Sequence, residues 1–184
     1  MRGYFGIGVE GLSKAMNAGA LFRTAHAFGA SFLFTVKAVY STRDVEKSDT
    51  SKSWAHVPLY SFETWKDLSL PHNCALVGIE LTDDAVELPS FTHPPQAAYI
   101  LGPERGSLSP EVTGLCEHVV KIPTKFCVNV GLAGAIVMYD RVVSMGRHAP
   151  RPEFPGGPTE SLPPPDFGPP LWVRKKRNRE KLKG

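Results

Sequence analysis

The chain has 184 residues, of which 42% are hydrophobic, and it carries a formal net charge of +3. This length favours one folded domain with an appendage over two full domains. The three cysteines, Cys74, Cys116 and Cys127, form no CxxC pair, no apolar run is long enough to cross a bilayer, and Glu10 stands where a signal peptide would be apolar. We therefore expect a reduced, cytoplasmic protein with no metal, no disulfide framework and no membrane contact.

Short apolar runs alternate with helical segments over residues 1–149. The expected strands are residues 4–9, 32–36, 57–60, 75–80, 97–101 and 119–122. The expected helices are residues 17–28 with Asn17 as the N-cap, residues 62–68, a helix that begins at Ser109-Pro110-Glu111, and residues 129–146. Such alternation predicts an α/β fold with a mostly parallel sheet flanked by helices.

The basic charge is concentrated at the C-terminal end. Residues 1–150 contain 13 Lys and Arg against 14 Asp and Glu, whereas residues 151–184 contain 8 against 4. Residues 150–170 are dense in proline, which prevents both helix and central strand, and residues 172–181 read WVRKKRNREK. We expect a folded domain over 1–149 and a proline-rich linker with a basic tail over 150–184. This tail either contacts RNA phosphates or is a disordered, solubilising terminus.

Residues 6–11, GIGVEG, match the GxGxxG pattern of dinucleotide-binding proteins. The strand that would precede the turn is very short, because only five residues come before Gly6. Moreover, residues 12–37 contain no Asp or Glu that could bind a ribose hydroxyl. We therefore reject a nicotinamide or flavin enzyme.

Three other segments combine polar side chains with glycines: residues 17–25 (NAGALFRTA), 101–106 (LGPERG) and 121–133 (KIPTKFCVNVGLA). The second and third follow predicted strands, and ligands of α/β proteins gather beyond the carboxyl ends of parallel strands. Taken singly, Arg23 fits a structural ion pair equally well, Glu104 a surface charge pair, and Asn129 a helix N-cap. Their convergence on one pocket is the prediction that the pattern supports.

These segments resemble the three motifs of the SpoU/TrmH family of RNA methyltransferases: NxGxxxRTA, GPExxG, and IP…N followed by a helix of small residues. The resemblance extends from Asn17 to Ala135, with the motifs in the family's order. It implies a deep trefoil knot in the C-terminal part of the domain, which is an exception to the rule that chains do not thread their own loops. It also implies that the loops after residues 75–80, 97–101 and 119–122 wrap a bent S-adenosylmethionine.

The resemblance also assigns roles. Arg23 would act at a ribose 2′-hydroxyl, with Asn17 and Glu104 holding the loops and Asn129 ordering the site. The implied cofactor contacts are Ile79, Glu80, Leu101, Gly102, Ile122, Cys127 and Leu132. Because a guanidinium stays protonated in proteins, we expect Arg23 to stabilise developing negative charge or to anchor a phosphate rather than to act as a base.

The expected function is therefore ribose 2′-O-methylation of a structured RNA by a homodimer, with tRNA a better candidate than rRNA. The chain departs from the family where it has Cys127-Val128-Asn129 in place of Ser-Leu-Asn, and where the loop before it is shorter. These departures leave two alternatives open. One is a non-catalytic RNA-binding paralogue, and the other is a methyltransferase that acts on a base or a protein.

Overall fold

The computed structural model describes residues 3–38, 56–104, 106–146, 148, 151, 155 and 156. The chain divides into two compact units, residues 1–146 and 147–184. Almost all of the predicted linker and basic tail lie outside the described residues, so the boundary at 149/150 and the role of the tail stay predictions.

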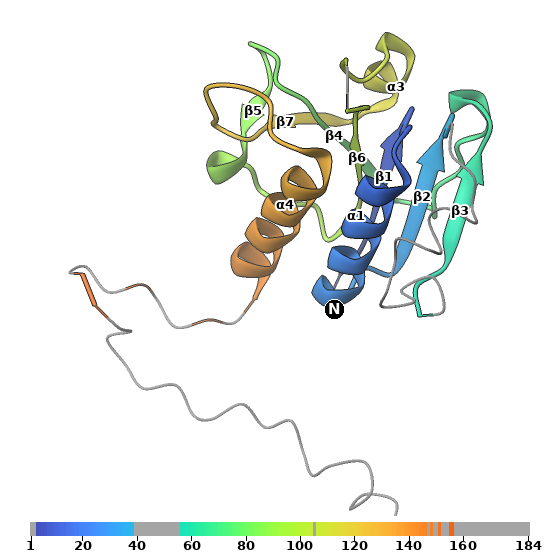
Figure 1. The fold of residues 1–184 in the computed structure, drawn as a ribbon. Coiled ribbons are helices and arrows are strands. Elements are labelled where there is room, and N and C mark those ends of the chain that lie inside the picture. Colours follow the sequence, from blue (N-terminus) through green and yellow to red (C-terminus); the bar gives the residue numbers. More distant parts are fainter. Residues whose placement is uncertain are drawn as a thin grey trace, which may run out of the picture. The chain divides into compact units, whose positions relative to one another are not determined.

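A parallel sheet forms the centre of this unit (Figure 1). Its strands are β1 (Tyr4–Glu10), β2 (Phe32–Val36), β3 (Leu59–Phe62), β4 (Ala75–Ile79), β5 (Val86–Glu87), β6 (Gln96–Leu101) and β7 (His118–Lys121). Their order across the sheet is β3-β2-β1-β6-β4-β7-β5, and all the pairings are parallel. The predicted parallel α/β architecture is thus confirmed, with β6 inserted between β1 and β4.

Helices cover both faces of the sheet. Helices α1 (Ala15–Phe28) and α4 (Val130–Met145) lie side by side on one face (Figure 1), where they pack on alternate strand residues such as Ile7 and Tyr99. The other face is covered by α3 (Pro110–Leu115) and by the segment around the short 3₁₀ helix η2 (Trp65–Asp67), which pack on neighbours such as Ile100. This period of two in the burial follows from the alternation of side chains along a strand.

The close packing of α1 on α4 depends on a small residue in α4. A Cβ atom added at Gly134 would lie 2.3 Å from Leu21 Cδ1 of α1, and this distance is too short for a contact between carbon atoms. The absence of a side chain at Gly134 therefore allows the buried Leu21 to fill the space between the two helices.

Gly6 and Gly8 have a structural role that explains the GxGxxG match. Both lie inside β1, and a Cβ at Gly6 would be 2.3 Å from the Phe32 ring, while one at Gly8 would be 2.5 Å from the Phe34 carbonyl oxygen. They make room for the aromatic side chains of β2. Because they stand in a strand rather than in a turn before a helix, they form no phosphate-binding loop.

One predicted helix is confirmed with a different start, and another is wrong. Helix α1 begins at Ala15 with Lys14 at the N-cap, so Asn17 lies in the first turn and its side chain is used elsewhere. The helix predicted over 62–68 is wrong: Phe62 ends β3, and only the 3₁₀ turn Trp65–Asp67 follows. The Thr64 and Asp67 side chains close a capping box around this single turn, and the run to Pro71 does not continue it.

The remaining elements differ from prediction by small shifts. Strand β3 lies two residues later than predicted, whereas β2 has the predicted bounds. Ser109 caps α3 as expected, because its side chain accepts a hydrogen bond of 3.2 Å from the Val112 N–H. Strand β5 and the 3₁₀ helix η3 (Leu88–Ser90) were not predicted, since each has only two or three residues.

Candidate functional site

A cavity of about 390 Å³ opens where several parallel strands end. Its walls come from the residues that end or follow β4, β6 and β7, namely Ile79 and Glu80, Leu101 and Gly102, and Ile122. The starts of α1 and α4 complete the cavity with Lys14, Asn17 and Asn129. In open parallel sheets this is the edge at which ligands bind.

The structure brings together most of the residues that the sequence singled out. The predicted residues that line the cavity are Asn17, Ile79, Glu80, Leu101, Gly102, Glu104, Ile122, Cys127 and Asn129. The two others, Arg23 and Leu132, do not line it. Arg23 is exposed on α1, and Leu132 is 61% exposed on α4. The functional roles of all these residues stay predictions at this point.

Hydrogen bonds join the three sequence motifs to one another. Asn17 Nδ2 donates to Glu104 Oε1 at 3.1 Å, and Asn17 Oδ1 accepts from Asn129 Nδ2 at 3.2 Å. Asn129 also caps α4, since its Oδ1 accepts from the Gly131 N–H at 2.9 Å. The Asn129 side chain thus makes both contacts: its oxygen caps α4, and its nitrogen binds the first motif.

The Glu104 carboxylate fixes the start of α1. Besides Asn17, it accepts hydrogen bonds from the Lys14 N–H at 3.1 Å and from both the N–H and the hydroxyl of Ser13, at 3.3 and 3.2 Å. Burial raises the pKa of Glu104, but hydrogen bonds from its own backbone, Asn17, Ser13 and Lys14 outweigh burial and hold this pKa below the ordinary 4.5. Glu104 is therefore ionised at neutral pH. Its carboxylate holds the backbone of Ser13 and Lys14 directly before α1, and its negative charge lies near the positive end of the helix dipole.

Two more carboxylates hold the loop between β6 and α3. Glu80 Oε2 accepts from the Leu108 N–H at 2.7 Å and Glu10 Oε2 accepts from the Ser109 N–H at 2.8 Å. Gly102 fits closely against this loop, because a Cβ there would lie 3.0 Å from the Leu108 nitrogen. Sequence reasoning missed the role of Glu10. The available signal was an acid that directly ends a buried strand, where burial demands hydrogen-bond partners.

Two classes of site receive no support from the described part of the chain. Among those residues, no group of three or more His, Cys, Asp and Glu side chains is placed to hold a metal ion. The helices described there include none that combines the length and the apolar character needed to span a bilayer.

Comparisons with known proteins agree with this geometry. The model of the SpoU rRNA Methylase family matches residues 5–139. No curated protein sequence matches the chain. One similar solved structure is the SpoU methyltransferase AviRb from Streptomyces viridochromogenes in complex with AdoMet, with a TM-score of 0.67 and 21% identity over 78% of this chain. The chain covers only 61% of AviRb.

Two smaller proteins have a similar fold. A protein solved to explain the 2-OH methylation of C/U34 on tRNA has a TM-score of 0.66 and 20% identity, over 78% of this chain and 91% of that one. The A. aeolicus TrmH/SpoU tRNA modifying enzyme has a TM-score of 0.65 and 17% identity, over 76% of this chain and 74% of that one. At such identities the structures show the fold alone, whereas the family match spans the three motifs and the strands that present them. The chain therefore belongs to the SpoU rRNA Methylase family.

Proposed function

We propose that this protein transfers a methyl group from S-adenosylmethionine to a ribose 2′-hydroxyl of a structured RNA. The observation that carries the proposal is the hydrogen-bonded chain Glu104–Asn17–Asn129, which joins the three family motifs at the wall of one cavity. Residues that served only to pack the core would not line an open cavity, as these three residues do.

The cavity fits S-adenosylmethionine in size and in chemical character. Its volume lies in the range of small-molecule sites. Ile79, Leu101 and Ile122 offer apolar walls suited to an adenine ring, while the Glu80 carboxylate offers an acceptor for ribose hydroxyls. Gly102 keeps the loop backbone close to this volume. When bound, S-adenosylmethionine supplies a methyl group on a sulfonium that an oxygen nucleophile can attack.

The protein's own part in such a transfer is alignment and charge stabilisation. The loops held by Glu104, Glu80 and Asn129 fix the geometry of the cavity before a substrate arrives, which is the main requirement of a direct displacement. Arg23 is proposed to stabilise the negative charge that develops on the ribose oxygen, or to bind the adjoining phosphate. A permanently charged guanidinium is suited to both tasks.

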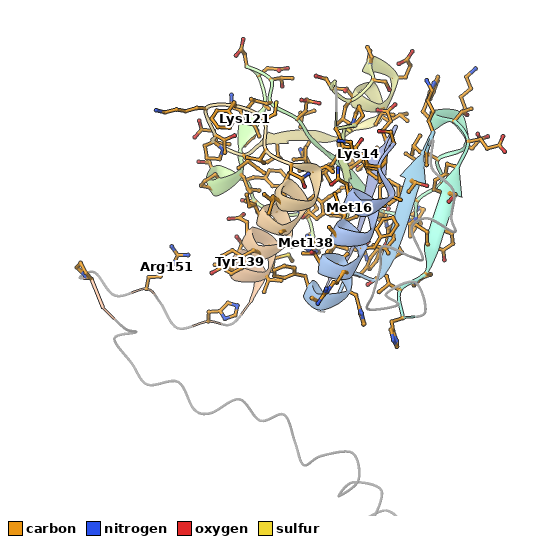
Figure 2. All side chains as sticks on the ribbon, viewed as in Figure 1. Lys14, Met16, Lys121, Met138, Tyr139 and Arg151 are labelled. Atoms are coloured by element: carbon orange, nitrogen blue, oxygen red, sulfur yellow. The ribbon has the colours of Figure 1, made fainter. Side chains whose placement is uncertain are left out.

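The position of Arg23 favours a homodimer. Exposed apolar side chains form a stripe on α4, with Leu132, Ile136 and Tyr139 at 61%, 39% and 55% exposure, and Met16 of the neighbouring α1 is 71% exposed. Figure 2 labels Met16 and Tyr139 on these two helices. Arg23 follows Met16 by seven residues, which places both on one face of α1. A symmetric dimer formed through α1 and α4 would cover the stripe and carry Arg23 towards the partner's cavity.

The trefoil knot implied by the family resemblance is part of the proposal, and the order of the strands and the contacts of α4 support it. Strand β4 lies between β6 and β7, and the chain then returns from β7 through α4 to the side of α1. On this return α4 contacts both β6 and η3, and η3 belongs to the connection between β4 and β6. These contacts support the passage of the last segment through that connection. A crystal structure with a continuous chain trace tests it directly.

For the substrate we propose tRNA. The support comes from two proteins of similar fold and comparable length, of which one was solved in connection with tRNA methylation and the other is a tRNA modifying enzyme. The family description names rRNA, so both RNAs belong in the test.

The deciding experiment has two measurements. Calorimetry of the full chain with S-adenosylmethionine reports cofactor binding, and mass spectrometry of digested tRNA and rRNA after incubation reports a 2′-O-methylated nucleoside. The proposal expects both signals. RNA binding without cofactor binding would establish the non-catalytic paralogue instead, and methylation found only on a base or a protein would overturn the assignment to ribose.

A further inference from the structure

Phe126 is the most exposed large hydrophobic side chain in the described part of the chain, at 75%. It lies in the loop between β7 and α4, and residues on both sides of it, Thr124 and Cys127, line the cavity. Because the Phe126 ring is exposed to water, it contributes no hydrophobic stabilisation to the fold. Its exposed position at the rim of the site allows the ring to contact a bound partner.

The loop around Phe126 is held in shape from within. The Thr124 hydroxyl donates to the Phe126 carbonyl oxygen at 2.9 Å, and the Thr124 N–H donates to the Ile122 carbonyl oxygen at 2.7 Å. These bonds bend the backbone between Ile122 and Phe126. The ring is thus presented from a fixed turn, which lowers the entropy lost when it meets a ligand.

A cationic residue, Lys125, directly precedes Phe126 in the chain. Lys125 is exposed and borders a second cavity of about 360 Å³, which shares Leu81 and Thr124 with the first. Lys121, on the same cavity, donates from Nζ to the carbonyl oxygens of Thr82 and Asp83 at 3.1 and 3.0 Å, so its charge is fixed on this side of the rim. Figure 2 shows Lys121 at the end of the sheet where the cavity loops lie.

We infer that Phe126 stacks on a nucleobase of the RNA next to the methylated ribose, while Lys125 contacts the adjoining phosphate. This inference rests on the proposed function and adds a substrate-positioning pair to it. Proteins that bind unpaired nucleotides combine aromatic rings, on which bases stack, with cations that follow the backbone. An aromatic ring and a cation at successive positions of a held loop, at the rim of the proposed methyl-transfer cavity, provide that combination.

The test compares four variants with the wild-type chain: Phe126→Ala, Phe126→Leu, Phe126→Trp and, as a matched control, Tyr60→Ala. Tyr60 is another exposed aromatic residue, 53% exposed on the edge strand β3, and it does not line the cavity. The measurements are the Kd for RNA by fluorescence anisotropy, the KM for RNA in methyl transfer, and the Kd for S-adenosylmethionine.

We expect Phe126→Ala and Phe126→Leu to raise the Kd and KM for RNA by about fivefold to about one hundredfold. The affinity for S-adenosylmethionine should not change. Phe126→Trp should keep RNA binding near the wild-type value, and so should Tyr60→Ala. RNA binding that is equally strong with leucine and with tryptophan would overturn the inference, because an apolar contact with protein or cofactor does not need a flat ring.

The same experiments distinguish two further outcomes: a role of Phe126 in the subunit contact, and a failure of the proposed function. If Phe126→Ala converts a dimer into monomers in light scattering, the ring belongs to the contact between subunits and the inference is wrong. If the wild-type chain binds no S-adenosylmethionine and methylates no RNA, the proposed function fails, while the anisotropy series still decides whether Phe126 stacks on RNA.

Discussion

Asn17 and Glu104, which are 87 positions apart in the chain, are joined by a hydrogen bond of 3.1 Å from Asn17 Nδ2 to Glu104 Oε1. The bond connects the first turn of α1 to the loop that follows β6. Since the other end of the Asn17 amide accepts from Asn129, one side chain fixes the relative positions of two loops and a helix at the cavity. The geometry of the site thus depends on residues that need not touch a substrate.

Replacing Glu104 with Gln should loosen the site. The side-chain amide offers only one acceptor oxygen, so its NH₂ group would face either the donors of Ser13, now on Oε2, or those of Lys14 and Asn17, now on Oε1. We expect a loss of about 1.5–3 kcal/mol in the free energy of unfolding, as for other hydrogen bonds to charged groups. Urea denaturation measures this, with the exposed Glu63→Gln as the control. A Glu104→Gln chain as stable as that control would contradict the role given to the carboxylate.

The sequence was sufficient to predict much of this site because its signals are local. Apolar runs such as residues 97–101 mark buried parallel strands, and polar residues placed directly after them must lie at one edge of the sheet. The position of β6 between β1 and β4 could not be read in the same way. It depends on pairings between segments about ninety residues apart, as in the register of Tyr4 with Gln96.

Where the prediction failed, long-range contacts replaced a local preference. Asn17 is a good N-cap by type, but α1 begins at Ala15, and the Asn17 side chain is hydrogen-bonded to Glu104 and Asn129 instead. Arg23 was expected to converge on the same pocket, but it follows Asn17 by six residues. On a helix this spacing turns its side chain away from the buried Asn17, and it is exposed instead.

Arg141 was missed because its partners are scattered along the chain. It is buried on α4 and donates to the carbonyl oxygens of Pro94, Pro95 and Tyr4 at 2.8, 2.9 and 3.2 Å and to the Tyr99 hydroxyl at 2.9 Å. These bonds attach α4 to the amino ends of β1 and β6. They lie at the opposite end of the strands from the cavity.

Arg141→Met should therefore cost stability without touching the site. Several buried oxygens would lose their donors, and we expect a decrease of about 3–5 kcal/mol in the free energy of unfolding. Urea denaturation of this variant is compared with Lys66→Met, a change on the surface that should stay within about 0.5 kcal/mol. Equal midpoints for the two variants would show that the network carries no net stability.

His93 should give the stability a dependence on pH. The Tyr99 hydroxyl oxygen accepts a hydrogen bond from Arg141, so its own proton is donated to His93 Nδ1, at 2.6 Å. The hydrogen of the neutral imidazole is then on Nε2, which donates to Asp140 at 2.9 Å. Burial lowers the pKa of His93 below 6.5, and Arg141 lowers it further, although Asp140 opposes both.

The sign of the effect follows from this lowered pKa. Above pH 6.5 the histidine is neutral in both the folded and the unfolded chain, and its contribution to stability is fully present. As the pH falls below 6.5 towards the folded pKa, the unfolded chain takes up the proton first, so the free energy of unfolding should decrease. His93→Gln keeps a donor and an acceptor but does not titrate. Denaturation from about pH 8 to about pH 5 should show a smaller decrease for this variant, and parallel curves would refute the assignment.

Arg23 and the cavity of the same chain are expected to serve different active sites of a dimer, and mixing two inactive variants tests this. Arg23→Ala should abolish ribose methylation with cofactor affinity unchanged, because Arg23 lies outside the cavity. Gly102→Val should abolish cofactor binding, since any side chain at that position meets the Leu108 backbone at 3.0 Å. Each variant alone should therefore be inactive, for a different reason.

Heterodimers formed by mixing the two variants contain one complete site only if Arg23 acts across the interface. The intact cavity of the Arg23→Ala chain would then receive its arginine from the Gly102→Val chain. We expect methylation to reappear after the mixed chains are unfolded and refolded together, and not after either variant is treated alone. If the mixture stays inactive while native mass spectrometry shows heterodimers, then Arg23 does not act across the interface.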